Sequence, residues 1–277
     1  MKFQSLFIIF IIFNIFLLGF FAFLCIFPMF FMDNHQFSFF WTSNWYLLMI
    51  IFIIIIIFDL YFLFNRKLYL LLEKEDWPAL VHYLENRVLR KGKYSPRLVR
   101  ILANTYLVLS DSTGVISLEN KAGLANSKLV DNNALVFGTA RILGKDFSGA
   151  VRFFESKLGK GKSGQHQWIS WYYGFALLLN KQYEKASREF SGLANSSKDG
   201  VICGLSAYFL DNSIAKSLPA HKKVLKATAM EGRERVLKVL PRLKNWIKET
   251  HEIKGEIHTA VLSKYMEETG RLLYATA

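Results

Sequence analysis

The chain has 277 residues, of which 52% are hydrophobic, and a formal net charge of +13 at pH 7; this length suits one or two domains. The hydrophobic excess is concentrated in the first 64 residues, where the only charged residues are Lys2, Asp33 and Asp59. This distribution excludes an ordinary soluble domain at the N-terminus, whereas the remaining residues have a soluble composition.

Two long apolar runs follow one another in this first part, approximately from Phe3 to Phe31 and from Tyr46 to Phe64. Each reaches or exceeds the roughly 20 residues that a helix needs to cross about 30 Å of hydrocarbon. The first run is too long for the apolar segment of a signal peptide, and no small-x-small cleavage site follows it, so we expect it to stay in the mature protein. The sequence therefore predicts a membrane anchor of two transmembrane helices in residues 1–64.

The positions of lysine and arginine predict the orientation of this anchor, because cationic loops stay on the cytoplasmic side. The loop between the two runs has no lysine or arginine, whereas such residues come soon after the second run, among them Arg66, Lys67, Arg87, Arg90, Lys91 and Lys93. Both termini are therefore expected in the cytoplasm. The external loop carries aromatic residues that suit the membrane interface: Phe39, Phe40, Trp41, Trp45 and Tyr46. Cytoplasmic thiols stay reduced, so no disulfide framework is expected for Cys203.

Asp59 is the one ionisable residue within a predicted span, and such residues are costly in a membrane and often functional. A proton or ion path normally needs partners, and the first span offers only Asn14. We favour a position near the cytoplasmic end, within reach of the lipid headgroups or of Arg66. A functional role for Asp59 is the alternative.

After Phe64 the sequence has amphipathic spacing, little proline and few alternating β-branched runs, which predicts an all-α fold. Two segments align at a constant offset of 36 residues, with four matching pairs: Gly138 and Gly174, Phe147 and Tyr183, Ala150 and Ala186, Phe154 and Phe190. This pattern resembles the tetratricopeptide repeat (TPR), a helical hairpin with a small residue in its first helix and an aromatic residue, alanine and a large apolar residue in its second.

The resemblance implies a TPR-like solenoid of three to four repeats across residues 65–200. A fainter copy with the same internal spacing occurs at Leu68, Trp77, Leu80 and Leu84, and it leaves room for one degenerate repeat before the clear copies. An isolated hairpin cannot bury its apolar face, so neighbouring repeats must stack. The first helix of the faint copy would continue the second membrane helix, which would hold the repeats rigidly at the membrane surface.

The stretch "LGKGKSGQ", residues 158–165, contains a Gly-Lys-Ser run that is typical of phosphate-binding loops. Such a loop needs a second glycine five positions upstream, where this chain has Ser156, and a preceding strand, where this chain has helical spacing. We therefore interpret the stretch as a turn between two repeats.

The first helices of the two clear repeats would line a partner-binding groove with six apolar residues: Trp168, Trp171, Phe175, Leu178, Leu135 and Ile142. Family members that grip a terminal carboxylate use lysine and asparagine at such positions, and neither clear repeat has them. The resemblance therefore implies an apolar groove or a self-packed face. For Trp168 and Trp171, burial by a neighbouring helix and a binding role both stay open.

Residues 201–277 are expected to cap the stack as helices, and they contain the most cationic stretch of the chain, from Lys216 to Lys248. In "VLKVLPRLKNWIKE" six apolar residues share one predicted face: Val236, Val239, Leu240, Leu243, Trp246 and Ile247. The basic surface is represented by Lys222, Lys223, Lys226, Arg242 and Lys244. Three explanations stay open: a solvated capping face, a surface for anionic lipid or an acidic partner, and a nucleic-acid footprint, for which no recognition motif is evident.

The segment "HEIKGEIH" places His251, Glu252, Glu256 and His258 close together in sequence, but the two histidines are seven residues apart, with a glycine between them. This spacing does not give the i, i+4 arrangement of a helical zinc site. No serine or cysteine nucleophile has a nearby base pattern. The sequence thus predicts no catalytic residue, metal or cofactor, although an enzyme with an unrecognised site stays an alternative.

Together these patterns predict a membrane-anchored scaffold or adaptor that organises partner proteins at the cytoplasmic face of a bacterial-type inner membrane. Apolar groove contacts would give affinity, and the cationic surface would steer acidic partners. The alternative is a basic module that binds anionic lipid or nucleic acid. The partner, the pathway and the oligomeric state do not follow from the sequence.

Overall fold

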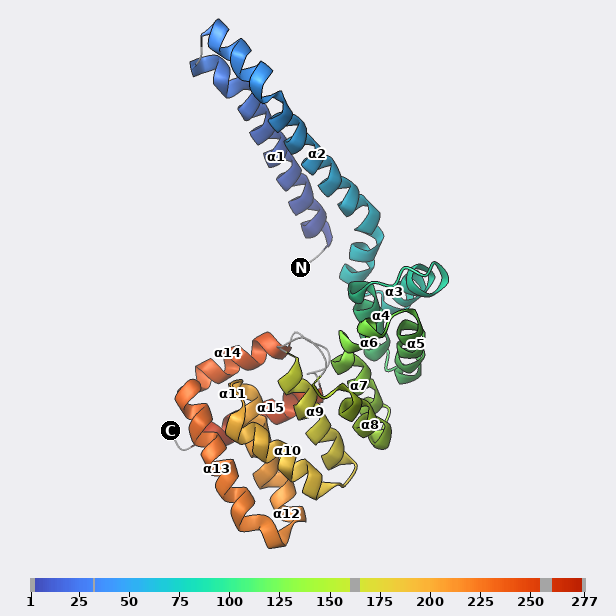
Figure 1. Ribbon diagram of the computed structural model, residues 1–277, viewed down its shortest axis with the longest axis vertical. Helices are drawn as coiled ribbons and strands as arrows, with labels where there is room; N and C mark the ends of the chain where they lie inside the picture. The colour runs from blue at the N-terminus through green and yellow to red at the C-terminus, as the bar shows by residue number, and fades with distance from the viewer. Residues whose placement is uncertain (1–2, 32, 160–164, 255–260, 276–277) are drawn as a thin grey trace. The chain divides into compact units, whose positions relative to one another are not determined.

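The computed structural model describes residues 3–31, 33–159, 165–254 and 261–275 (Figure 1). These described residues form helices joined by short connections and include no strand, so the predicted all-α fold is confirmed. The chain divides into two compact units, Met1–Tyr83 and Leu84–Ala277. Each unit is described by itself.

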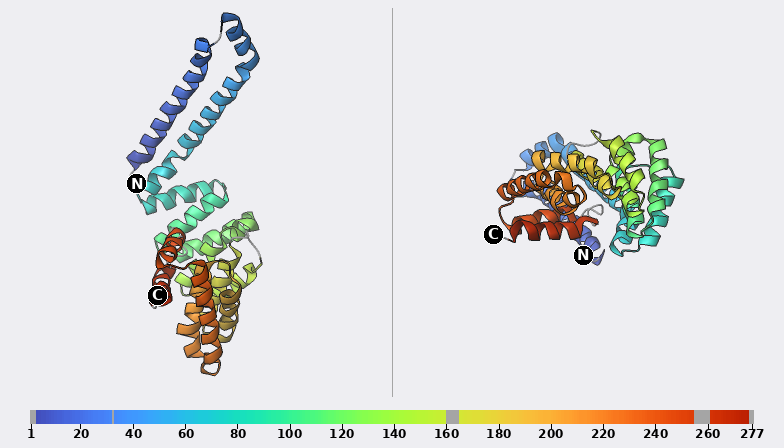
Figure 2. Two further views of the ribbon diagram at one scale, coloured as in Figure 1. Left: turned by 90° about the vertical axis from the view of Figure 1, so that its left-hand side faces the viewer. Right: turned by 90° about the horizontal axis from the view of Figure 1, so that it is seen from below.

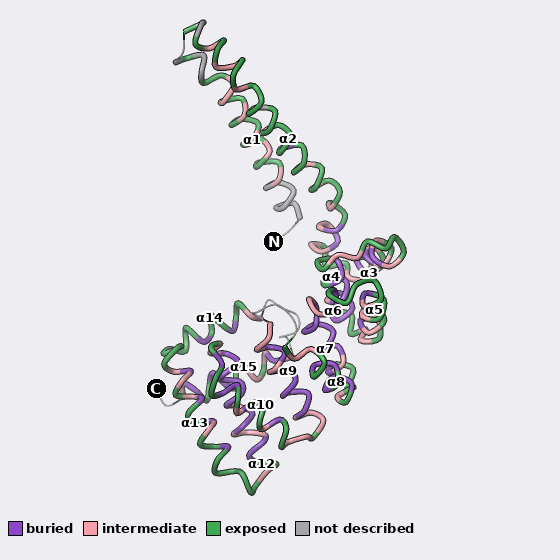
Figure 3. The backbone as a smooth tube through the Cα atoms, viewed as in Figure 1, coloured by how far each residue is buried: buried purple, intermediate pink, exposed green. Residues whose placement is uncertain are grey.

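The first unit contains the helices α1, Phe3–Phe31, and α2, Asn34–Glu73. They pack against each other through aromatic rings, with centroid distances of 3.8 Å for Phe10 and Phe62 and 6.2 Å for Phe21 and Phe52. Most of their other apolar side chains are exposed, as the green tube in Figure 3 shows. Both helices are long and apolar enough to cross a membrane.

The predicted loop of residues 32–45 is wrong, because α2 already begins at Asn34. The polar side chains of this segment are accommodated within the helix: Thr42 Oγ1 donates to the Ser38 carbonyl at 3.0 Å, and Asn44 Nδ2 to the Phe40 carbonyl at 2.9 Å. At its other end α2 continues without a break to Glu73, as predicted, so the predicted domain boundary after residue 64 falls inside a helix. At about 1.5 Å per residue, α2 is roughly 60 Å long, about twice the hydrocarbon thickness.

Asp59 lies at one end of the paired apolar segments. The neighbouring Phe58 and Phe62 contact Phe10, which is the first residue of the apolar window Phe10–Phe27 in α1. The side chain is partly exposed, and its Oδ1 atom has no hydrogen-bond partner among the described residues. Whether Asp59 is functional stays open.

The remaining elements continue in chain order to the C-terminus (Figure 1). Their bounds are α3 Trp77–Glu85, the π-helical turn η1 Asn86–Arg90, α4 Pro96–Val108, α5 Ser112–Ala125, α6 Ser127–Asp131, α7 Ala134–Leu143, α8 Phe147–Lys157, α9 His166–Leu179, α10 Tyr183–Ser196, α11 Gly200–Phe209, the π-helical turn η2 Leu210–Ile214, α12 Ala215–Ser217, the 3-10 turn η3 Pro219–His221, α13 Lys222–Val239, α14 Leu243–Lys254 and α15 Ser263–Tyr274.

Four helix pairs share one type of turn. Glu75, Ser110, Lys145 and Lys181 all have a positive φ, between 53° and 60°, at intervals of 35, 35 and 36 residues. In each turn the N–H of this residue donates to the carbonyl three residues earlier, and the next N–H donates to the carbonyl five residues earlier. These are the two bonds of a Schellman motif, which ends a helix and redirects the chain. The next helix begins two residues later each time, at Trp77, Ser112, Phe147 and Tyr183.

Within Leu84–Ala277 the hairpins pack on one another in chain order, from α4 and α5 to α9 and α10, and α11 and α13 follow (Figure 2). The aligned glycine and phenylalanine residues come together in both clear copies, since Gly138 contacts the Phe154 ring and a Cβ at Gly174 would lie 3.3 Å from Phe190 Cε1. These small residues allow the two helices of each hairpin to approach closely.

The Gly-Lys-Ser stretch lies between α8, which ends at Lys157, and α9, which begins at His166. Ser156 is part of α8, so a helix precedes the stretch, as expected for a connector. Residues 160–164 lie outside the described residues, and their interpretation as a turn stays a prediction.

Candidate functional site

The six residues predicted to line a groove lie on α7 and α9: Leu135, Ile142, Trp168, Trp171, Phe175 and Leu178. Five of them are 0–9% exposed, and only Leu178 has intermediate exposure. The structure therefore places these side chains in the interior of the second unit, where Leu178 alone is partly accessible to a partner.

Neighbouring helices cover this aromatic cluster. Trp171 lies 5.3 Å from Phe175 and 5.8 Å from both Phe190 of α10 and Phe209 of α11, measured between ring centroids. Tyr265 of α15 lies 4.9 Å from Phe209 and 6.1 Å from Phe175. The sequence left open whether Trp168 and Trp171 are buried by a neighbouring helix or bind a partner. In the structure both are buried by neighbouring helices.

The predicted basic surface is divided between two helices. Lys222, Lys223 and Lys226 lie on the first turns of α13, and all three are exposed. Arg242 and Lys244, also exposed, lie at the start of α14.

The two arginines of α13 are tied to the protein. Arg233 pairs with Asp211 at 2.7 Å, and Lys226 Nζ lies 3.8 Å from the same carboxylate. Arg235 donates to the carbonyls of Ala194 and Ser197 at the end of α10. Arg233 and Arg235 thus connect α13 to other elements of the unit, whereas the side chains of the α13 lysines are exposed.

The predicted single apolar face of residues 236–247 is wrong, because the helix ends at Val239 and a new helix begins at Leu243. Pro241 has no N–H to continue the helix and keeps Leu240 out of the helical region, at φ −120° and ψ 76°. The six apolar residues therefore separate into two groups. One group is buried and consists of Val236, Leu240 and Trp246. The other group is 45–61% exposed and consists of Val239, Leu243 and Ile247.

The helices α14 and α15 lie antiparallel. The Trp246 Nε1–H donates to the Met266 carbonyl at 3.0 Å, and the Tyr274 hydroxyl donates to the Leu240 carbonyl. The contacts thus run in opposite order along the two segments, because Leu240 precedes Trp246 whereas its partner Tyr274 follows Met266. The Tyr208 hydroxyl of α11 donates to Glu268, which attaches α15 to the preceding helices. Burial and this hydrogen bond raise the pKa of Tyr208 to about 12.

Two glycines make room for the indole ring of Trp246. A Cβ at Gly270 would lie 2.8 Å from Trp246 Cδ1, and a Cβ at Gly204 would lie 2.9 Å from Trp246 Cη2. Both distances are shorter than real Cβ contacts, so the buried indole fits between α11 and α15 only because these positions carry no side chain.

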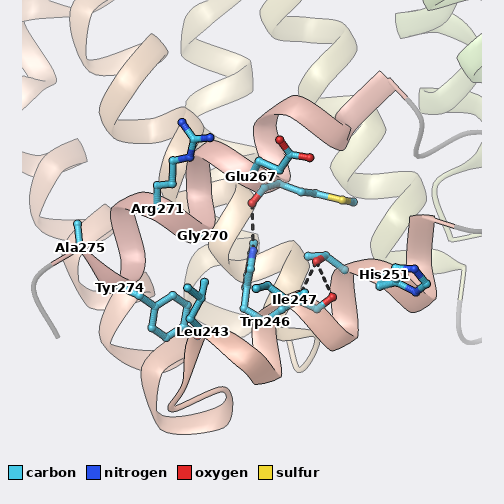
Figure 4. Close-up of a pocket in the computed structure, with 11 residues that line it drawn as sticks. Leu243, Trp246, Ile247, His251, Glu267, Gly270, Arg271, Tyr274 and Ala275 are labelled. Carbon is cyan, nitrogen blue, oxygen red and sulfur yellow. Dashed lines mark hydrogen bonds between the residues drawn. The ribbon is translucent and has the colours of Figure 1, made fainter.

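A cavity of about 650 Å³ opens between α14 and α15, a size that is common for binding sites (Figure 4). Its lining consists of Leu243, Trp246, Ile247, Thr250, His251, Met266, Glu267, Gly270, Arg271, Tyr274 and Ala275. We call it the α14–α15 groove. Apolar side chains form most of the lining, and charged groups come from α15, which carries Arg271 and Glu267. Leu243 and Ile247, 45% and 55% exposed, are accessible to a partner.

Charged residues are distributed along both helices of the α14–α15 groove. Arg242 and Lys244 lie at the start of α14, and Glu249 and Glu252 lie further along it. On α15, Glu267 and Glu268 lie near the middle of the helix, and Arg271 follows Glu267 by one helical turn. Two lysines lie near acidic groups of their own helix, Lys248 at 4.0 Å from Glu252 and Lys264 at 3.8 Å from Glu268. Charges of both signs thus occur within the groove, where Glu267 and Arg271 are neighbours on α15.

Sequence reasoning singled out Leu243, Trp246 and Ile247 but not their partners on α15. Met266, Gly270 and Tyr274 recur every four residues, which is typical of one helix face and could have indicated the second wall. The segment "HEIKGEIH", for which no metal site is predicted, is only partly described, because Glu256 and His258 lie outside the described residues. The described residues hold no group of three or more His, Cys, Asp or Glu side chains suited to a metal ion, and the expectation of no metal site stays a prediction.

The comparisons with known proteins concern the second unit. A family model described as "Uncharacterised Treponema protein" matches residues 114–275, which is more than half of the chain and includes the α14–α15 groove. A curated relative, "Uncharacterized protein" from Treponema pallidum (strain Nichols), is 28% identical over 160 residues, 57% of this chain and 51% of the relative. The chain thus spans about half the length of the curated relative that it matches.

Proposed function

Since the chain belongs to the family described as "Uncharacterised Treponema protein", we propose a function that rests on the part this family covers: a scaffold or adaptor that binds acidic partner proteins. The two apolar helices anchor it in a membrane, the helical hairpins support the binding surface, and its role is non-catalytic. The binding surface is formed by the lysines of α13.

The observation that carries this proposal is the concentration of positive charge around α13, where the exposed Lys222 and Lys223 lie outside the ion pairs that Arg233 and Lys226 form with Asp211. Residues 216–248 contain ten lysine and arginine residues and two glutamates, a net +8 of the chain's +13. Lys222 and Lys223 are exposed in the first turn of α13, and two exposed apolar side chains, Val224 at 67% and Met230 at 63%, lie on the same helix. A mixed cationic and apolar surface suits an acidic partner that also offers apolar contacts.

The helical hairpins form a TPR-like solenoid in this proposal. The four turns at intervals of 35 or 36 residues support it, since they mark helix pairs of nearly equal length. The close contacts of Gly138 and Gly174 with aromatic rings of the following helix support it as well. The helices α11 to α15 then cap the stack, and α15 covers the apolar face that α9 presents.

The anchor follows the predicted orientation, with the second unit in the cytoplasm of a bacterial cell. In support, the stretch between the two apolar helices has no lysine or arginine, whereas cationic residues come soon after α2. The cytoplasmic membrane surface is itself anionic, so anionic lipid is the competing ligand for the same lysines.

The test uses the full chain, crosslinked and affinity-purified from detergent-solubilised membranes. A variant with Lys222→Glu, Lys223→Glu and Lys226→Glu is compared with a matched control, Lys145→Glu, Lys181→Glu and Lys185→Glu, whose lysines are exposed on other elements. We expect the α13 variant to lose copurifying proteins that the control keeps. The same proteins in both samples would move the interface elsewhere, and a loss of only lipid or nucleic acid would favour those ligands.

A further inference from the structure

We propose that the exposed side of α14 docks on the surface of an anionic phospholipid bilayer, with an apolar pair of side chains among the lipid headgroups and two lysines at the phosphates. The apolar pair is Leu243 and Ile247, and the lysines are Lys244 and Lys248. This inference goes beyond the proposed function, because it assigns a second surface, outside the α13 lysines, and needs no partner protein. A bilayer suits this chain, since both helices of the first unit are long and apolar enough to cross one.

The first argument is the apolar pair that α14 leaves in water. Leu243 and Ile247 follow one another by one helical turn, line the α14–α15 groove and are 45% and 55% exposed (Figure 4). The neighbouring Trp246 is buried and donates to the Met266 carbonyl, so α14 is attached to the unit while the pair stays accessible. A helix that lies on a membrane buries such an apolar face about 5–10 Å deep, at the boundary between headgroups and acyl chains.

The second argument is the position of the charges around the apolar pair, which selects an anionic surface. Lys244 and Lys248 are exposed, and each lies about 100° around the helix from the apolar residue before it, on the same side. The exposed Glu249 and Glu252 lie roughly 140–160° from the middle of the pair, on the far side of α14. Lys248 Nζ lies 4.0 Å from Glu252, a contact between exposed groups that water weakens. The lysines thus flank the apolar pair, as in helices that bind anionic membranes.

The other charges near the apolar pair do not oppose an anionic surface. The α15 wall of the groove contributes Arg271 and Glu267, one helical turn apart, whose charges cancel. Among the described residues, Arg242 and Lys244 have no carboxylate within ion-pair distance. Residues 238–248 contain no Asp or Glu and four cations: Lys238, Arg242, Lys244 and Lys248. Each cation near an anionic membrane surface adds to the attraction.

The first experiment measures whether position 247 enters the bilayer. The full chain is reconstituted into vesicles of phosphatidylcholine, either alone or mixed with anionic phosphatidylglycerol, and both mixtures contain a lipid with a quenching group on its acyl chain. Ile247→Cys carries an environment-sensitive dye and is compared with Asn245→Cys, an exposed position on the opposite side of α14. Both variants carry Cys25→Ser, which leaves the buried Cys203 as the native thiol.

We expect the dye at position 247 to be quenched in the anionic vesicles, to be quenched less in the neutral ones, and to respond far more than the dye at position 245. No quenching at position 247, equal quenching at both positions, or equal quenching in both kinds of vesicle would overturn the proposal. A photoreactive benzophenone at position 247 in native membranes should crosslink to lipid. Crosslinks to a second copy or to another protein instead would assign this surface to that occupant and refute the bilayer.

Neutralising the lysines tests the electrostatic part. In the labelled Ile247→Cys chain, Lys244→Gln with Lys248→Gln should lower the ratio of inserted to free α14 about ten-fold in anionic vesicles. The matched control, Lys222→Gln with Lys223→Gln on α13, removes the same charge and should leave the quenching unchanged. Equal effects of the two pairs would show that only the net charge matters and would refute docking through α14. A chain that keeps its α13-dependent partners but shows no quenching would refute the docking and leave the proposed function standing.

Discussion

Gly270 and Trp246 show how one residue without a side chain determines a local structure. The indole ring lies between Gly270 and Gly204, and its N–H is satisfied by the Met266 carbonyl. Trp246 is 2% exposed and also lines the α14–α15 groove. The wall of the α14–α15 groove therefore depends on the glycine at position 270.

We expect Gly270→Ala to lower the free energy of unfolding relative to a matched substitution, Gly192→Ala. Both glycines lie inside helices and gain the same helix propensity, but a Cβ at Gly192 meets nothing within 4 Å, whereas one at Gly270 meets the indole at 2.8 Å. The two variants should differ by about 1–3 kcal/mol. Urea unfolding of the full chain in detergent, followed by circular dichroism, measures the difference. Equal stabilities would contradict the close packing of α15 on Trp246.

Glu189 is a second residue with a testable energetic effect. Burial raises the pKa of its carboxyl above the ordinary value, so the folded protein favours the protonated form. The protonated carboxyl therefore contributes to the free energy of unfolding below the unfolded pKa, and this contribution is lost as the pH rises through the folded pKa. Glu189→Gln should therefore stabilise the protein at pH 7, by less than about 1 kcal/mol because the group is partly exposed, and less at pH 4. Thermal melts at the two pH values test this; a destabilised variant at pH 7 would refute it.

At the scale of elements, the repeated turn and the break before α14 determine where helices end and the chain changes direction. After three of the four turn residues with positive φ, the next helix begins with an aromatic residue: Trp77, Phe147 or Tyr183. None of the four is glycine, although glycine adopts this conformation at the lowest cost. The chain thus retains four strained positions at the ends of helices.

Glycine at these turns should be stabilising. We expect Lys145→Gly to raise the free energy of unfolding by about 1 kcal/mol, because lysine at φ 60° is in the left-handed region. The control, Lys185→Gly, replaces an exposed lysine inside α10 and should lower it by about 1 kcal/mol. Urea titrations of both variants provide the measurement. Destabilisation of the same size in both would show that Lys145 does not need the turn conformation.

At the scale of the whole molecule, the two apolar helices of the first unit differ from the helices of the second. Only 0% and 6% of the residues in their apolar windows are buried, whereas the helices of the second unit bury most of their apolar side chains. Exposed apolar side chains along two helices of this length suit an apolar medium. Membrane insertion, with the second unit in the cytoplasm, is part of the proposed function.

Thiol labelling in cells tests this orientation. In a Cys25→Ser background, Ser43→Cys near the start of α2 should react with an impermeant maleimide in spheroplasts whose inner membrane is intact. Val224→Cys on α13 should react only after that membrane is broken. Both sites are exposed, so access to the reagent decides the result. Labelling in the opposite order would reverse the topology.

The helical class, the two long apolar helices and the continuation of the second of them into the first hairpin could all be predicted from the sequence. These features depend on local periodicity and on spacing along the chain, which the sequence states directly. The burial of Trp171 and the opening beside Trp246 could not be predicted in this way. Both depend on where α15 packs, because Tyr265 covers α9 and α11 while Gly270 faces the indole, and contacts between residues 20 to 90 positions apart leave no local pattern in the sequence.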